Sequence, residues 1–367
     1  MDARAISLNV LIILLADGAL SEEKGRDPSR HVVVCADAGA GGYEAFPDVC
    51  LRKSGEMLCV FYAGFAHVSL PGYGPGGKLP PECPKNGRVC LVRSADFGRT
   101  WSRAEVVVDT PLDDRDPSMA ELRDGTLLVT FFSLEAGEDG KSYRFVRSSI
   151  TRSRDGGRTW SPPEKLFDDW AVSSPVRILS KERLALSLYY VKDEKSPGRS
   201  YGGVSFSLDG GKTWGDPVPV GKDGPLALDA EPDLVELPGG RLLVALRPVM
   251  AWSASEDGGK SWTRPEKIGF EAHCPYFLRL RSGILLLAHR IPGTSLHYSL
   301  DDGRSWGPNV PIDSVGGAYP SLCELPPPFP EGSAFVVYYE EGPGSSIRGR
   351  WLRATREGVQ WVGPDGK

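Results

Sequence analysis

An eight-residue motif, Ser-x-Asp-x-Gly-x-Thr/Ser-Trp, occurs five times in this chain. The copies begin at Ser94, Ser153, Ser207, Ser255 and Ser299. Successive copies are therefore 59, 54, 48 and 44 residues apart, which is the spacing of propeller blades rather than of helical pairs. In each copy the Asp side chain can accept hydrogen bonds from backbone N–H groups two or more residues further along the chain. The Gly permits a positive φ. The motif predicts a tight hairpin whose Trp packs against a neighbouring strand.

Each copy of this motif is called a box below. A second repeat lies between the boxes. Each of six units begins with a short strand that contains a proline, at Phe46-Pro47, Asp116-Pro117, Ser174-Pro175, Glu231-Pro232, Cys274-Pro275 and Tyr319-Pro320. A turn and an apolar strand follow: MLCVFY, TLLVTFF, RLALSLYY, RLLVALR, ILLLAHR and AFVVYYEE. Five units end in a box and one more short strand. The sixth has no box, so we expect its outer strands from 347–353 and from either 359–361 or the N-terminal 31–34, which would close the ring.

The pattern predicts an all-β protein, a six-bladed β-propeller of four-stranded antiparallel blades. No stretch shows a sustained helical period, so helices should be few. Gly 44 and Pro 31 among 367 residues suit many short strands joined by turns. We expect residues 28–367 to form this one domain.

Charge and hydropathy exclude some partners. The net charge of −5 provides no basic stripe for a nucleic acid, and no apolar run reaches the length of a membrane span. Residues 5–16 form an apolar stretch of signal-peptide length, so residues 1–22 are predicted to be a signal peptide of a secreted or periplasmic protein. The alternative is a cytoplasmic protein in which this stretch is a buried strand or follows a misassigned start. Seven cysteines without a CxxC pair indicate neither a metal knuckle nor a disulfide framework, and no cofactor is expected.

Strand alternation locates a site. In a four-stranded blade the box lies at the same end as the turn between strands one and two. The start of strand one and the end of strand two therefore meet at the opposite end, around the central channel. Polar and aromatic side chains gather there in the sequence: Tyr62 to His67, Asp113 to Asp116, Tyr189-Tyr190, Asp229, Glu231, Arg247, His273, His289-Arg290, Tyr319 and Tyr338 to Glu341. Such a set suits the recognition of a charged ligand or acid–base chemistry.

The boxes and the six units resemble the sialidase (neuraminidase) superfamily over nearly the whole chain. The segment from Asp229 to Arg247 resembles the stretch that holds a glutamate and a carboxylate-binding arginine, which maps Glu231 and Arg247. His289-Arg290 resembles the segment with another arginine of the triad. The segment 316–322 resembles the one that carries the nucleophilic tyrosine, which maps Tyr319.

Two elements of the family pattern are absent. The first arginine belongs to an Arg-Ile-Pro motif, and this chain has Ala45-Phe46-Pro47 there. The acid–base aspartate precedes the first box, where this chain has 88–92 (RVCLV). By position, Arg115 could replace the arginine, and Asp116 or Asp114 the acid; His67 is a further acid candidate.

The resemblance implies an exo-acting glycosidase with a Tyr319 nucleophile and a Glu231 base. A neutral phenol avoids repulsion by the carboxylate on the anomeric carbon of sialic acid. Arg247 and Arg290 would bind that carboxylate, and Asp116 would protonate the leaving oxygen. Without a complete arginine triad, the substrate could be another acidic sugar, or a neutral one held by His273 and the tyrosines.

Three hypotheses follow. The first is a sialidase-type hydrolase acting on a glycan or glycoconjugate. The second is a related propeller that acts on a different sugar, as a uronate or arabinan hydrolase or a lyase, and the missing arginine favours it. The third is a non-catalytic glycan-binding or protein-binding propeller, which the Glu231, Arg247 and Tyr319 set disfavours. A metal site built from His67, His273 and His289 is disfavoured because their spacing matches no ligand motif.

Overall fold

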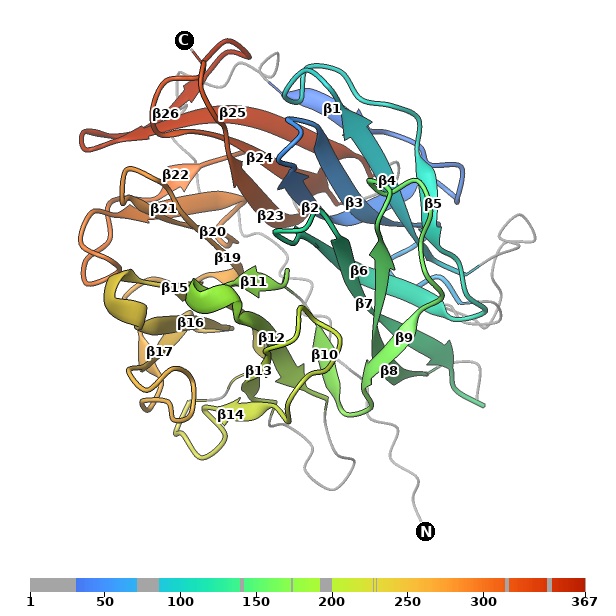
Figure 1. Ribbon diagram of the computed structural model, residues 1–367, viewed down its shortest axis with the longest axis horizontal. Helices are drawn as coiled ribbons and strands as arrows, with labels where there is room; N and C mark the ends of the chain where they lie inside the picture. Colours follow the sequence, from blue (N-terminus) through green and yellow to red (C-terminus); the bar gives the residue numbers. More distant parts are fainter. Residues whose placement is uncertain are drawn as a thin grey trace, which may run out of the picture. The chain divides into compact units, whose positions relative to one another are not determined.

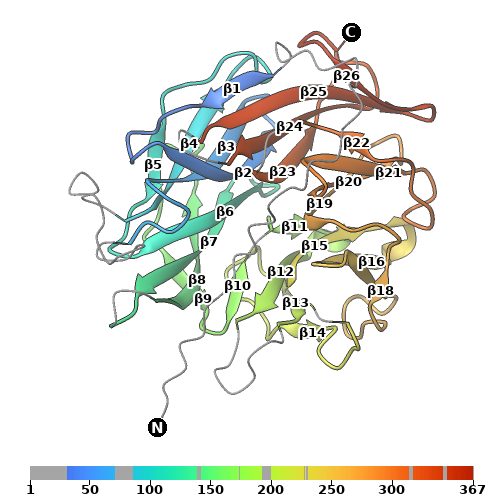
Figure 2. The ribbon, with the colours of Figure 1, turned by 180° about the vertical axis from the view of Figure 1, so that it is seen from behind.

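Six antiparallel sheets follow one another around a central axis in a computed structural model of the chain (Figures 1 and 2). The structure describes residues 31–70, 86–138, 142–172, 174–191, 200–226, 228, 230–313, 317–341 and 345–366. The predicted signal peptide at 1–22 lies outside these residues. Residues 31–367 form a single unit, and it is the predicted six-bladed propeller.

Each sheet starts with its innermost strand and runs outward. Blade 1 contains β2 (Tyr43–Leu51), β3 (Met57–Gly64), β4 (Arg88–Ser94) and β5 (Glu105–Val108). Blade 2 contains β6 (Asp113–Glu121), β7 (Leu127–Ala136), β8 (Tyr143–Ser153) and β9 (Glu164–Phe167). In blade 3 the inner strand is split, so the sheet consists of β10 (Trp170–Val172), β11 (Arg177–Ile178), β12 (Leu184–Tyr190), β13 (Gly202–Ser207) and β14 (Val218–Val220).

The second half of the chain continues in the same way. Blade 4 contains β15 (Ala230–Glu236), β16 (Leu242–Arg247), β17 (Ala251–Ser255) and β18 (Glu266–Lys267). Blade 5 contains β19 (His273–Arg279), β20 (Leu285–Arg290), β21 (Ser295–Ser299) and β22 (Val310–Pro311). The helical elements within the described residues are the one-turn 3₁₀ segments η2 (Ser180–Glu182) and η3 (Pro238–Gly240), neither long enough to cross a membrane.

The sixth blade closes the ring with both of the segments that the sequence offered as alternatives. Its inner strands are β23 (Gly317–Glu324) and β24 (Ser333–Glu340), followed by β25 (Ile347–Thr355). One half of β25 pairs with the N-terminal β1 (Val32–Cys35), and the other half with β26 (Gly358–Val362). Because β25 is long enough for both partners, the two ends of the described chain meet in one sheet.

The boxes form the predicted hairpins, at the ends of the third strands. In the first, the Ser94 hydroxyl donates to Asp96 at 2.8 Å and accepts from the Gly98 amide at 2.8 Å. Asp96 also accepts from the backbone and hydroxyl of Thr100. Gly98 has a φ of 89°, which a side chain would disfavour. The Trp101 ring then packs near Phe335 of blade 6, so the box joins neighbouring blades.

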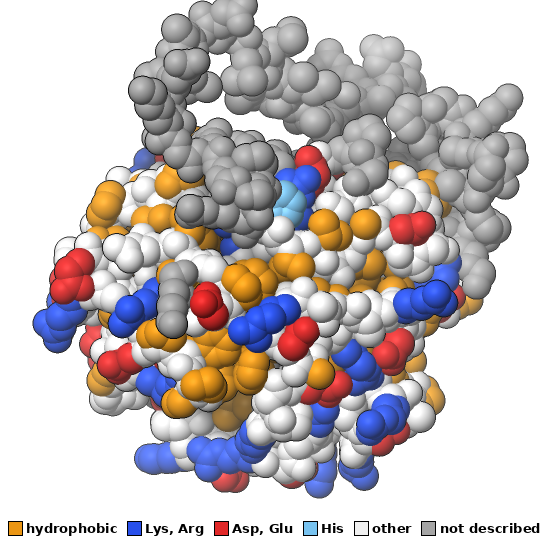
Figure 3. Space-filling view, turned by 90° about the horizontal axis from the view of Figure 1, so that it is seen from above, with side chains coloured by type: hydrophobic (Ala, Val, Ile, Leu, Met, Phe, Trp, Pro, Cys, Tyr) orange, Lys and Arg blue, Asp and Glu red, His pale blue; other side chains and the backbone are white. Residues whose placement is uncertain are grey.

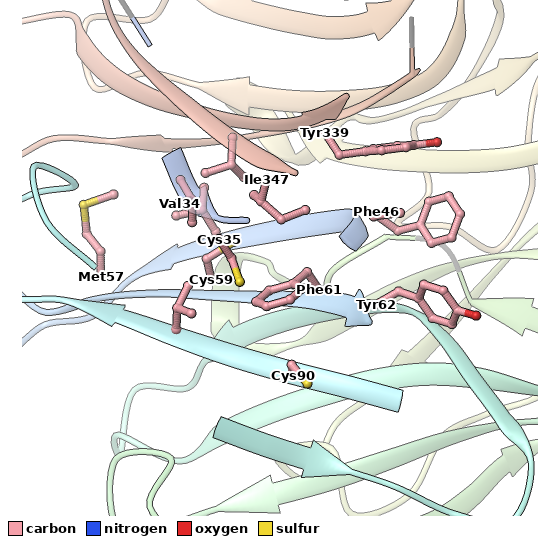
Figure 4. Packing of buried hydrophobic residues seen from close by; sticks show 14 of the residues in the cluster. Val34, Cys35, Phe46, Met57, Cys59, Phe61, Tyr62, Cys90, Tyr339 and Ile347 are labelled. Atoms are coloured by element: carbon pink, nitrogen blue, oxygen red, sulfur yellow. The ribbon is translucent and has the colours of Figure 1, made fainter. Parts of the chain in front are cut away.

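Apolar side chains fill the spaces between adjacent sheets. At the junction of blades 6 and 1 the cluster includes Val34, Cys59, Phe61 and Ile347 (Figure 4). Of the cysteines that the structure describes, five are buried and Cys50 is half-buried, all as free thiols. Cys35, Cys59, Cys90 and Cys323 are small residues of the blade 6/blade 1 core.

Polar side chains near the axis connect neighbouring inner strands. Asp48 accepts a bond from the Met119 amide of blade 2 at 2.7 Å. Asp233 accepts from the Phe277 amide of blade 5 at 2.6 Å. Each bond satisfies a buried carboxylate with a backbone donor of the next blade. At the closing junction the Ser321 hydroxyl of blade 6 takes the place of the aspartate and accepts from the Val49 amide of blade 1 at 3.0 Å.

The outer surface carries charges of both signs. On the face shown in Figure 3, Lys and Arg side chains are interspersed with Asp and Glu side chains and with hydrophobic ones. The described part of that face therefore presents no continuous basic surface for a nucleic acid.

Candidate active site

A β-bulge interrupts the inner strand at the residue before its proline, in five of the six blades. The pairing register shifts there in β2, β6, β15, β19 and β23. The bulged residues have positive φ angles: Phe46 54°, Asp116 50°, Glu231 46°, Cys274 53° and Tyr319 41°. A residue before proline normally stays extended, and positive φ is uncommon outside glycine. The repeated distortion brings these five side chains to one pocket, which they line together with Pro47, Pro117, Pro275 and Pro320.

Glu231 and Tyr319 form the centre of this pocket. The Tyr319 hydroxyl donates to Oε1 of Glu231 at 2.9 Å, and Nη1 of Arg247 lies 2.6 Å from Oε2. Burial, with Cys274 and Glu231 close by, raises the pKa of Tyr319 well above its usual value. The phenol is therefore neutral in the resting site, and its proton can pass directly to Glu231.

Arg290 lies beside the same tyrosine. Its guanidinium carbon is 5.5 Å from the centre of the Tyr319 ring. Among the residues that the structure describes, its guanidinium makes no hydrogen bond or ion pair, and Nε is buried without a partner. His273 pairs with Arg290 across the strands, and burial together with the charges of Arg247 and Arg290 lowers the pKa of His273 to about 4. The imidazole is neutral and adds no competing charge.

Asp116 contributes a second carboxyl group to the pocket. It is 8% exposed, and its Oδ1 is buried without a hydrogen-bond partner in the part of the chain that the structure describes. Nε of Arg115 lies 3.6 Å from that oxygen, too far for a hydrogen bond. Burial raises the pKa of Asp116 to about 6, although the charge of Arg115 lowers it. This carboxyl group can therefore hold a proton up to about pH 6.

Arg115 contacts residues of blade 1 and of its own blade 2. It is 4% exposed, and Nη1 donates to the His67 carbonyl at 2.6 Å and lies 3.7 Å from Asp113. The guanidinium also lies over the rings of Phe46 and Tyr62, at 5.1 and 5.5 Å from their centres. Arg247 and Arg290 thus adjoin the Tyr319–Glu231 pair directly, whereas Arg115 supports the wall beside it.

That wall is aromatic. Phe46, Tyr62 and Tyr339 project in the same direction at one end of the blade 6/blade 1 cluster (Figure 4). The ring centres of Phe46 and Tyr319 are 4.9 Å apart. His67 is exposed at the rim of the site, and its Nδ1 forms a hydrogen bond of 3.2 Å with the Tyr43 hydroxyl. Packing against neighbouring atoms and the charges of Arg115 and Arg290 lower the pKa of His67.

Asp114 and His289 lie apart from the pocket lining. The carboxylate of Asp114 accepts bonds from Ser133 and from the amide and hydroxyl of Thr110. Nε2 of His289 is 2.7 Å from Nδ1 of His297 within blade 5. Among the described residues no group of three or more His, Cys, Asp and Glu side chains could hold a metal ion.

The sequence did not assign roles to two residues of the site. Cys274 occupies the blade 5 bulge, and the repeated proline was the signal that could have identified it. Tyr189 lies at the end of β12. Strand alternation predicts its position opposite the boxes but assigns it no role. Burial, with Glu231 and Asp116 nearby, raises its pKa, so a second neutral phenol adjoins the two carboxyl groups.

Comparison with known proteins identifies the family of the chain. Residues 85–327 match the model of the BNR repeat-like domain. The chain belongs to this family. No curated protein matches its sequence.

Solved structures confirm the sialidase-like fold of this BNR-family chain. A protein of unknown function from Dyadobacter fermentans has a TM-score of 0.72 and 24% identity, with 88% of this chain and 98% of that chain covered. The NanB sialidase from Streptococcus pneumoniae has a TM-score of 0.65 and 14% identity, with coverages of 86% and 69%. The intramolecular trans-sialidase from Ruminococcus gnavus has a TM-score of 0.65 and 13% identity, with coverages of 88% and 97%.

Proposed function

We propose that this BNR-family propeller is an exo-acting glycoside hydrolase of sialidase type, which releases a terminal sialic acid or another acidic sugar from a glycan. The observation that carries the proposal is the guanidinium of Arg290, partly buried beside Tyr319 without an ion-pair partner among the described residues. A desolvated cation is costly unless it is paired. An anionic group of the substrate would supply the missing partner next to the reacting phenol.

The proposed reaction uses a tyrosine nucleophile. The Tyr319 oxygen attacks the anomeric carbon while its proton passes to Oε1 of Glu231, 2.9 Å away. The bond to the leaving oxygen breaks as that oxygen takes a proton from Asp116. Water, deprotonated by Asp116, then displaces the tyrosine, which recovers its proton from Glu231. Arg290 holds the substrate anion, and Arg247 keeps Glu231 in place.

A uronic acid is the second candidate substrate. Ala45, which stands at the position of the family's first arginine, is fully buried, and Arg115 is bound to the His67 carbonyl and Asp113. Among the described residues, only Arg247 and Arg290 therefore adjoin the Tyr319–Glu231 pair. With fewer arginine donors, the site suits a sugar whose carboxylate accepts fewer hydrogen bonds from the protein than that of a sialoside.

Hydrolysis of a 4-nitrophenyl sialoside beside a panel of 4-nitrophenyl uronides tests the proposal. We expect the wild-type protein to release nitrophenol from one acidic glycoside and not from its neutral counterpart. Arg290→Met should raise KM for that substrate at least about tenfold, because a charge-assisted bond is lost. Arg279→Met is the matched control, since Arg279 pairs with Asp302 outside the pocket. Absence of hydrolysis across the panel, or equal KM for both variants, would refute the assignment.

A further inference from the structure

Cys274 is a bulge residue without a part in the proposed mechanism. It is 6% exposed and comes from blade 5, between the blades that carry Glu231 and Tyr319. Its Sγ donates to Oε2 of Glu231 at 3.3 Å and accepts from Nη1 of Arg247 at 3.8 Å. The two carboxylate oxygens of Glu231 thus have different partners: Tyr319 bonds Oε1, whereas Arg247 and Cys274 hold Oε2.

We infer that Cys274 is a positioning residue for Glu231, which its S–H group and Arg247 hold by Oε2 so that Oε1 faces the Tyr319 hydroxyl. The inference rests on the proposed function, in which Glu231 takes the phenol proton. Without the thiol, one donor would still restrain Oε2, but the carboxylate could rotate about it. Proton transfer depends on donor–acceptor distance and alignment, so such a rotation would slow the reaction.

The thiol acts as a donor and not as a second nucleophile. Burial and the charge of Glu231 raise the pKa of Cys274 to about 12, although Arg290 and Arg247 oppose the shift. The thiolate is the reactive form of cysteine, and it is scarce at neutral pH here. A protonated S–H that points at a carboxylate favours the charged state of that carboxylate.

Two substitutions separate this role from simple packing. Cys274→Ala removes the donor, whereas Cys274→Ser retains one. We expect Cys274→Ala to lower kcat several-fold with little change in KM, and to move the acid limb of the kcat/KM–pH profile upward by about half a unit or more, because a hydrogen bond to a charged group is lost. Cys274→Ser should restore the profile toward that of the wild type.

A second buried cysteine provides the control. Cys90 is 1% exposed in β4 of blade 1, and Cys90→Ala removes the same atoms from a core position. It should lower the melting temperature and leave the pH profile unchanged. If Cys274→Ala also keeps the wild-type profile, or if Cys274→Ser does not restore it, the inference is wrong.

Thiol modification tests the contact without any substrate. In the full-length protein, the Cys274 thiolate attacks methyl methanethiosulfonate, forms a mixed disulfide and releases methanesulfinate. Mass spectrometry of the peptide that contains Cys274 gives the rate. Glu231→Gln should accelerate the reaction, since each unit by which the thiol pKa falls raises the thiolate fraction about tenfold. An unchanged rate contradicts the inference. Acceleration without hydrolysis of any glycoside in the panel supports the contact and rejects the proposed function instead.

Discussion

The hydroxyl of Tyr319 donates a hydrogen bond to Oε1 of Glu231 across 2.9 Å, although 88 residues separate them in the chain. Both side chains project from bulges before a proline, two blades apart. The hydrogen bond connects a nucleophile to its base in the proposed reaction. We therefore expect Tyr319→Phe to reduce kcat at least about a thousandfold while the melting temperature changes little.

Tyr338→Phe is the matched control for that change. Tyr338 is fully buried in β24 and donates to Asp313 at 2.7 Å, away from the pocket. Its loss should cost about 1 kcal/mol of stability and leave kcat unaltered. Equal kcat values for Tyr319→Phe and the wild type would remove Tyr319 from the mechanism.

The pH dependence of turnover should report Asp116. As a general acid it must be protonated, and burial raises its pKa to about 6, so kcat should fall as the pH rises through about 6. Asp116→Asn should lower kcat by about 10²–10⁴-fold for a poor leaving group. The loss should be much smaller for a 4-nitrophenyl glycoside, whose leaving group needs little protonation. Similar losses on both substrates would exclude Asp116 as the acid.

The same shift makes a prediction for stability. The pKa of Asp116 in the folded protein exceeds its ordinary value of 3.8. The protonated group therefore contributes stability, in full below pH about 4, and this stability is lost as the pH rises through about 6. The wild type should therefore lose stability as the pH rises from 4 to 7, whereas Asp116→Asn should not. The melting temperature of Asp116→Asn relative to that of the wild type should increase over this range. A gain of about 1 kcal/mol corresponds to about 2 °C or more.

Asp155→Asn should show the opposite trend. In the second box, hydrogen bonds from Thr159 and Ser153 lower the pKa of Asp155. The ionised group therefore contributes stability above pH about 4, and this contribution is lost at lower pH. The melting temperature of Asp155→Asn should fall below that of the wild type as the pH rises from 2 to 5. Parallel curves for the two aspartate variants would contradict the assigned shifts.

Trp214 tests the scaffold role of the boxes. Its ring is half-buried against the blade 2/blade 3 core. Trp214→Ala should destabilise the fold by somewhat less than the ~3–5 kcal/mol typical of a fully buried aromatic residue. kcat measured well below the melting temperature should be unchanged, because the box lies at the opposite end of the strands from Tyr319. A selective loss of kcat would connect the box to the site.

The repeats predicted the fold because they set the strand phase. Once the Trp boxes were assigned to the third turn of each blade, the opposite end of the strands followed, and Glu231, Arg247, Arg290 and Tyr319 do meet there. The sixth blade was left with two alternatives because sequence periodicity does not reveal that β25 pairs with different partners along its length.

Side-chain directions could not be read from the repeats. Arg115 and Asp116 are adjacent in the sequence, yet the bulge sends Asp116 into the pocket and Arg115 toward the His67 carbonyl. A positive φ before proline is a tertiary effect, since local preferences oppose it. For the same reason the contact between the Cys274 thiol and Glu231 could not be predicted from the sequence.

The bulges also bear on how such a protein could evolve. Each contributes one side chain to the pocket from an equivalent position of its blade, while the ladders, boxes and axial bonds are built from other residues. A point substitution at one bulge could exchange an acid, a thiol, a phenol or a phenyl ring without altering the sheets. A propeller of this kind can therefore give rise to enzymes with unrelated substrates, and the identity of five residues would be more informative about the reaction than similarity over the whole chain.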